Sequence, residues 1–107
     1  MLGKYKVIHL LGAIHYNKEL FRHVEEELTK QGFIVFAPVI YDPNVYKDVS
    51  GMIDEMCFEK LLACDAVCLL TPNHIGKLTA KRLRQAKELG KEIYVWSNDK
   101  LAKEELL

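Results

Sequence analysis

Residues 6–12 read Lys-Val-Ile-His-Leu-Leu-Gly, a short apolar run that ends at a glycine, and this pattern predicts a buried β-strand. An amphipathic helix is expected next, because apolar residues recur at helical spacing between a cap at Asn17 and a stop at Gly32. A second strand follows at residues 33–37. A strand, a helix and a strand in this order indicate a parallel β-α-β unit.

The rest of the chain continues this alternation. Further strands are expected at residues 66–70 and 92–96, and helices at residues 52–63, 77–89 and 99–107. The core positions expected in the helices over 52–63 and 77–89 are Met52, Ile53, Met56, Leu61, Leu78, Leu83, Ala86 and Leu89. We therefore expect one α/β domain over residues 1–107, with a parallel sheet of four or five strands and the order 2-1-3-4 for the first four.

Composition narrows the classes of function. Half of the 107 residues are apolar, and 15 basic residues balance 15 acidic ones. A net charge of zero argues against a nucleic-acid or membrane-surface partner, and no apolar run approaches the roughly 20 residues that span a bilayer. Three cysteines without a C-x-x-C pair argue against a zinc site and a disulfide framework, and indicate a protein of the reducing cytoplasm.

Charge is distributed unevenly along the chain. Residues 48–65 are acidic, whereas residues 77–91 are basic. A solvated helix face, or a basic helix that pairs with the acidic one, is the first interpretation of this pattern. The alternative is an interaction surface for an acidic protein or for nucleic acid, although no aromatic residue lies among the cations to stack on bases.

The predicted topology also places a ligand site. Ligands of parallel sheets bind beyond the carboxyl ends of the strands, where the strand order reverses, and here those ends lead into residues 12–17, 38–50 and 71–76. The helix that begins after Gly76 would favour a phosphate or carboxylate at its N-terminus, with Lys77 adding charge, unless Gly76 only forms a turn and Lys77 only faces water.

Histidines differ in their predicted surroundings. His15 and Tyr16 follow the first strand, where an imidazole could donate to a phosphate or act as an acid or base, and a tyrosine could stack on a base. His74 is a second candidate in the turn over 71–76. His9 lies inside a strand and is interpreted as a hydrogen-bonded core residue, and His23 is expected on the exposed side of its helix.

Several short motifs, taken in their order, resemble the nucleoside 2-deoxyribosyltransferase-like superfamily, and in particular its short phage- and firmicute-type members. Residues 8–15 resemble that family's first strand and its G-S-I-R motif, and residues 27–35 its first helix and second strand. Residues 54–56 and 64–67 are similar to the segment that leads into its third strand. Ile75-Gly76-Lys77-Leu78-Thr79, followed by residues 86–91, resembles its signature G-x-x-T/S helix and the G-K before its last strand, so the resemblance covers residues 5–96.

The resemblance implies a Rossmann-like or flavodoxin-like three-layer sandwich that cleaves the N-glycosidic bond of deoxynucleosides or their monophosphates, and a homodimer. This chemistry uses a carboxylate nucleophile and a second acid, without a metal or redox cofactor. In this chain Arg82 stands at the position of the nucleophile, and Cys57 at that of the assisting acid. Ala13 and His15 replace the serine and arginine of G-S-I-R.

Three functional hypotheses follow. The first is a nucleoside- or nucleotide-binding domain that has lost catalysis, with ligand contacts from Gly12, Ala13, His15, Tyr16, Asn73, His74, Gly76, Lys77, Thr79 and Arg82. The second is an active hydrolase or transferase in which Glu59 or Asp42 supplies a displaced carboxylate, with Tyr16 as a further catalytic candidate. The third is an interaction protein that uses the basic helix over 77–89.

Overall fold

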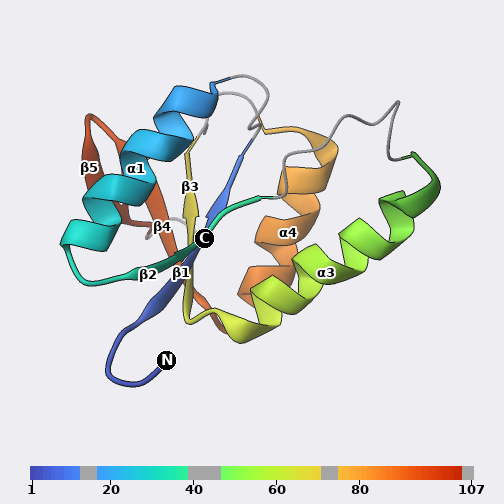
Figure 1. Cartoon of the computed structure of the whole chain (residues 1–107), viewed down its shortest axis with the longest axis horizontal. Coiled ribbons are helices and arrows are strands. Elements are labelled where there is room, and N and C mark those ends of the chain that lie inside the picture. The colour runs from blue at the N-terminus through green and yellow to red at the C-terminus, as the bar shows by residue number, and fades with distance from the viewer. Residues whose placement is uncertain (13–16, 39–46, 71–74, 105–107) are drawn as a thin grey trace.

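The computed structural model describes residues 1–12, 17–38, 47–70 and 75–104, which form a mixed α/β fold (Figure 1). The elements are β1 (Val7–Leu11), α1 (Lys18–Lys30), β2 (Ile34–Phe36), the 3-10 turn η1 (Lys47–Val49), α3 (Ser50–Ala63), β3 (Ala66–Leu69), α4 (Lys77–Glu88), β4 (Glu92–Ser97) and β5 (Lys100–Lys103). The predicted strands over the first 97 residues and the three longer predicted helices are all present, with ends that differ by a few residues.

The five strands form one sheet in the order β2-β1-β3-β4-β5. The first four are parallel, and Ile8 of β1 pairs with Val35 on one side and Ala66 on the other. The predicted order of these four strands is therefore confirmed. Strand order reverses at β1, since the chain adds β2 on one side of it and β3 on the other, and this is the position where such sheets bind ligands.

Both faces of the sheet are covered by helices, which is why β1 and β3 are buried along their whole length. Helix α1 packs through Phe21, Val24 and Leu28 against one face, where Ile8 and Leu10 of β1 also lie. Helices α3 and α4 pack on the other face, against the alternate residues of the same strand (Figure 1). Every second residue of β1 therefore points to α3 and α4.

The boundaries of α1 follow the predicted signals. The side-chain oxygen of Asn17 accepts a hydrogen bond of 3.0 Å from the backbone N–H of Leu20, as an N-cap does. Gly32 follows the helix with a φ of 94°, a left-handed conformation that favours glycine. The chain then enters β2, and the predicted β-α-β unit is confirmed.

The C-terminal helix predicted over residues 99–107 is wrong, because Lys100–Lys103 form strand β5, which pairs antiparallel with β4. Asn98 and Asp99 form the turn between them with φ values of 53° and 59°. Positive φ at both central residues matches the twist of a two-residue β-hairpin, and Asn and Asp adopt it more readily than other residues with side chains. Asp99, the first residue of the predicted helix, is part of this turn.

Four predicted core positions are also wrong. Met52, Met56, Leu78 and Leu89 are exposed, whereas Leu61 and Ala86 are buried and Ile53 and Leu83 are half-buried. For Met52 and Met56 the reason lies in the tilt of α3, whose N-terminal end lies farther from the sheet than its C-terminal end (Figure 1). Residues 39–46 of the predicted loop lie outside the described residues, and α3 begins at Ser50, two residues earlier than predicted.

No helix within the described ranges combines the length and the hydropathy that crossing a membrane requires.

Candidate functional site

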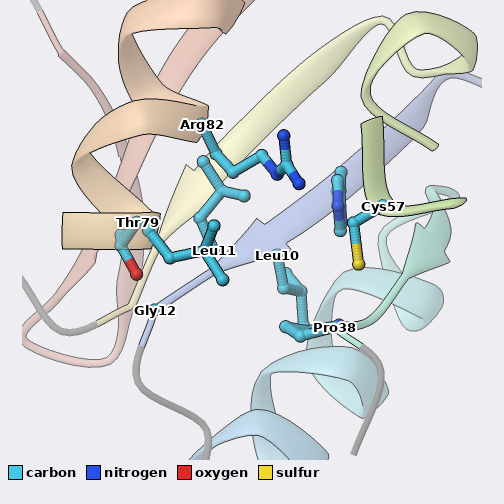
Figure 2. A pocket seen from close by; sticks show the side chains of 9 residues that line it. Leu10, Leu11, Gly12, Pro38, Cys57, Thr79 and Arg82 are labelled. Atoms are coloured by element: carbon cyan, nitrogen blue, oxygen red, sulfur yellow. The ribbon is translucent and has the colours of Figure 1, made fainter. Parts of the chain in front are cut away.

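A pocket of about 70 Å³ lies at the carboxyl end of β1, between α3 and α4. Its lining comprises His9, Leu10, Leu11, Gly12, Pro38, Cys57, Leu78, Thr79 and Arg82. In Figure 2, Cys57 and Pro38 lie on one side, Thr79 on the other, and Leu10 and Leu11 between them. The pocket therefore occupies the edge of the sheet where the strand order reverses.

The pocket combines apolar walls with a few polar groups. Leu10, Leu11, Pro38 and Leu78 supply hydrocarbon surface, while Thr79 contributes a hydroxyl group. Typical ligand pockets measure about 300–1,000 Å³ and share this mixture of apolar walls and sparse polar groups. The described walls thus enclose space for only part of a typical ligand.

Arg82 forms one wall of the pocket, and its guanidinium group reaches from α4 towards α3 (Figure 2). Its side chain is buried, and a buried cation requires a charged or hydrogen-bonding partner. Nη1 donates to the side-chain oxygen of Gln85 at 2.9 Å, and Nη2 donates to the backbone carbonyl of Asp54 at 2.9 Å. Nη2 also donates to a carboxylate oxygen of Asp54, which completes an ion pair between the two helices.

The interpretation of the basic helix as a partner of the acidic one is confirmed at this point. Lys81 also lies 3.5 Å from the second carboxylate oxygen of Asp54. Beyond the end of α4, Lys91 donates to the carbonyl of Leu62 in α3 at 3.0 Å. The cations at 81, 82 and 91 therefore stabilise the packing of α3 against α4.

His9 is buried and hydrogen-bonded, as predicted for a core residue, but it also lines the pocket. Its Nδ1 lies 3.1 Å from the carbonyl oxygen of Phe36. The pKa of His9 is lowered to about 4, chiefly by burial; the hydrogen bond to Phe36 opposes this shift, and the positive charges of Lys60 and Arg82 add to it. The imidazole is therefore neutral at pH 7.

Cys57 is half-buried in the wall formed by α3, whereas the other two cysteines are buried in the core. Burial raises the pKa of Cys68 to about 12, and it also raises the pKa of Cys64. Buried thiols with raised pKa values behave as small apolar residues. Cys64 and Cys68 are therefore core residues, whereas Cys57 lines the pocket.

The structure brings only part of the predicted site together. Of the predicted ligand residues, Gly12, Thr79 and Arg82 line the pocket, whereas Gly76 and Lys77 are exposed and do not. The remaining predicted residues, namely Ala13, His15, Tyr16, Asp42, Asn73 and His74, lie outside the described residues. Sequence reasoning missed His9 as a lining residue, although alternation along β1 assigns it to the same face as Val7 and Leu11.

Glu59, the described carboxylate candidate, does not line the pocket. It borders a separate groove of about 320 Å³ between α3 and α4, together with Asp54, Glu55, Phe58, Lys81, Arg82 and Gln85. Arg82 is common to both hollows. Among the described lining residues of the pocket there is no carboxylate, and the described ranges contain no group of three His, Cys, Asp or Glu side chains that could hold a metal ion.

The fold and the pocket together define an α/β domain with a small, mostly apolar site at the strand-order reversal. A family model described as a domain of unknown function, DUF4406, matches residues 8–95, and the chain belongs to this family. The matched range runs from β1 into β4 and contains every lining residue of the pocket. None of the curated proteins matches the chain.

Proposed function

We propose that this chain is a nucleoside- or nucleotide-binding domain of the nucleoside 2-deoxyribosyltransferase-like superfamily that has lost its catalytic carboxylates. One observation carries the proposal. Cys57 and Arg82 stand at the two positions where the resemblance implies catalytic groups, and they line one pocket although they belong to different helices. Such a meeting is expected if the resemblance reflects a shared site.

The topology supports the same relationship. A parallel sheet with the order β2-β1-β3-β4, α1 on one face and α3 and α4 on the other fits a Rossmann-like or flavodoxin-like three-layer sandwich. The antiparallel strand β5 is an addition at the sheet edge beyond β4. It lies on the far side of β4 from the pocket strand β1 and leaves the proposed site unchanged.

The chemistry of the lining supports binding without catalysis. Cleavage of an N-glycosidic bond needs a carboxylate against the anomeric carbon or an activated water, together with an acid for the leaving base. Arg82 is a cation paired with Asp54 and cannot serve as this nucleophile. Glu59 belongs to the neighbouring groove, so it is not placed to replace the missing carboxylate.

The pocket also suits one part of a nucleoside. A deoxyribose ring has hydrocarbon faces and a few hydroxyl groups, which correspond to the leucine and proline walls and to the side chains of His9 and Thr79. We propose that the sugar occupies the pocket. Two further attributes complete the proposal: action as a homodimer, which the resemblance implies, and a cytoplasmic location, which three free cysteines favour.

Saturation-transfer NMR with a mixture of 2′-deoxynucleosides and their 5′-monophosphates tests the proposal. We expect saturation transfer to at least one component and no free base after overnight incubation. Thr79→Tyr, which fills the pocket, should abolish the transfer. Thr29→Tyr is the matched control, because Thr29 is an exposed residue of α1, on the other face of the sheet.

Three other results of these experiments would each contradict one part of the proposal. Release of free base would show that the domain is an active hydrolase or transferase. An absence of saturation transfer for every component would overturn nucleoside binding. Saturation transfer that is as strong with Thr79→Tyr as with Thr29→Tyr would show that the ligand does not occupy this pocket.

A further inference from the structure

His9 is a polar side chain in the middle of a buried apolar strand. It is 2% exposed, and the other four residues of β1 are buried aliphatic side chains. An imidazole in such a position costs free energy unless its nitrogen atoms find hydrogen-bond partners. The partners of its two nitrogen atoms therefore indicate why a histidine can be retained here.

The hydrogen bond to Phe36 fixes the tautomer of the ring. A carbonyl oxygen can only accept, so Nδ1 of His9 must carry the proton in the 3.1 Å contact with the oxygen of Phe36. Because the low pKa keeps the ring neutral at pH 7, Nε2 then has a lone pair and no proton. In this state Nε2 is a hydrogen-bond acceptor and cannot donate.

The cations around His9 maintain this state. Lys60 and Arg82 both oppose protonation of the ring. Lys60 is held in place by donating to the carbonyl of Ala37 at 2.9 Å, and Arg82 is held by its ion pair with Asp54. Neither cation can approach the ring as a donor without losing these contacts.

Within the described residues, no group occupies the lone pair of Nε2. No described residue forms a hydrogen bond with Nε2, and no side-chain nitrogen or oxygen within the described ranges is both sealed from solvent and without a partner. The open space that His9 lines is the pocket at the end of β1. The pocket therefore offers a ligand one hydrogen-bond acceptor in Nε2 of His9.

We infer that Nε2 of His9 accepts a hydrogen bond from the 3′-hydroxyl group of a bound deoxyribose, and that His9 thereby selects sugars that carry this hydroxyl. The inference rests on the proposed function, which supplies the class of ligand. A carboxylate group, or a phosphate group in its dianionic form, cannot satisfy Nε2, because its oxygens offer lone pairs and no proton. The 3′-hydroxyl is the free sugar hydroxyl that deoxynucleosides and their 5′-monophosphates share.

A double-mutant cycle between protein and ligand tests the inference. The ligands are the common 2′-deoxynucleosides and their 2′,3′-dideoxy counterparts, and the proteins are the wild type and His9→Asn. The asparagine amide can still donate to Phe36 but has no atom at the position of Nε2. We expect the wild type to bind the dideoxy ligands about five- to tenfold more weakly, as for loss of one hydrogen bond, and the variant to bind both series equally.

A second measurement uses the wild type alone and does not depend on the folding of a variant. Long-range ¹H–¹⁵N NMR spectra identify His9 as the ring that stays neutral between pH 5 and 7, with the proton on Nδ1. We expect its Nε2 resonance to shift when a deoxynucleoside saturates the protein, and to shift less with the dideoxy counterpart.

The outcomes separate this inference from the function on which it rests. Equal wild-type affinity for both ligand series, or an Nε2 resonance that a bound deoxynucleoside does not move, would overturn the role of His9 and leave nucleoside binding established. A wild-type protein that binds no deoxynucleoside would overturn the proposed function, and the inference with it.

Discussion

Arg82 of α4 and Asp54 of α3 form an ion pair in which Nη2 of the arginine donates to both the carboxylate and the backbone carbonyl of the aspartate. The arginine is buried, whereas the side chain of Asp54 is 42% exposed. Two helices on one face of the sheet are thus joined by a cation at the position where the resemblance implies a nucleophile. Arg82 thus stands where the resemblance implies a catalytic carboxylate, and its ion pair with Asp54 holds one wall of the pocket in place.

Asp54→Asn should lower the free energy of unfolding by about 1–3 kcal/mol, because it leaves a buried guanidinium group without a charged partner. Glu55→Gln is the matched control on an exposed neighbour and should change stability by less than about 0.5 kcal/mol. Urea unfolding followed by the fluorescence of Trp96, which is buried, measures both. Equal losses in the two variants would show that the ion pair contributes no stability.

The hairpin between β4 and β5 provides a second pair of variants. Asn98 has a φ of 53°, a conformation that β-branched residues adopt only with strain. Asn98→Val should therefore lower the free energy of unfolding by about 1–2 kcal/mol, whereas Asn98→Gly should be close to neutral. Thermal unfolding of the two variants provides the comparison. If the Asn98→Val protein were as stable as the Asn98→Gly protein, the left-handed conformation of Asn98 would be contradicted.

This hairpin also shows why part of the fold could not be predicted from sequence. The run at residues 6–12 and the cap at Asn17 carry local signals with one structural meaning, and both predictions are confirmed. Asp99 carries a signal with two meanings, because aspartate is common both at helix N-caps and in left-handed turns. Pairing with β4, a tertiary contact, decides between them.

The candidate site, like the fold, could be predicted from the sequence only in part. Gly12 is predicted because it follows the first strand, and Thr79 because it belongs to the motif that resembles the family's signature helix; both line the pocket. The contribution of His9 was missed, since its position inside a strand favours an enclosed core residue. The pocket is also lined by Cys57 of α3 and Thr79 of α4, and no local pattern of residues encodes how these two helices come together.

Cys57 should be the cysteine that reacts first with N-ethylmaleimide in the folded protein. It lines the pocket, while Cys64 and Cys68 are buried thiols whose pKa values are raised. Mass spectrometry of tryptic peptides should locate the first adduct at Cys57, and a saturating deoxynucleoside should slow its formation several-fold. Cys57→Ser is the control and should remove the fast reaction. First labelling at Cys68 would contradict the burial of that thiol.

His9 should make stability depend on pH between 4 and 6.5. The folded protein binds a proton at His9 only near its pKa of about 4, whereas the unfolded chain does so near the ordinary pKa of 6.5. In this range the unfolded state therefore binds more protons, and the free energy of unfolding falls as pH falls. The loss that His9 causes reaches about 3 kcal/mol at pH 4.

Urea unfolding from pH 7 to pH 4 measures this dependence, and His9→Asn separates it from other groups. Carboxylates such as Asp65 and Glu92, whose pKa values are lowered by their hydrogen bonds, lose their contributions at more acidic pH. The wild type should therefore lose much more stability than the variant between pH 6.5 and 4.5. Parallel losses in the two proteins would mean that the imidazole is not held neutral, and the acceptor role of Nε2 would lose its physical basis.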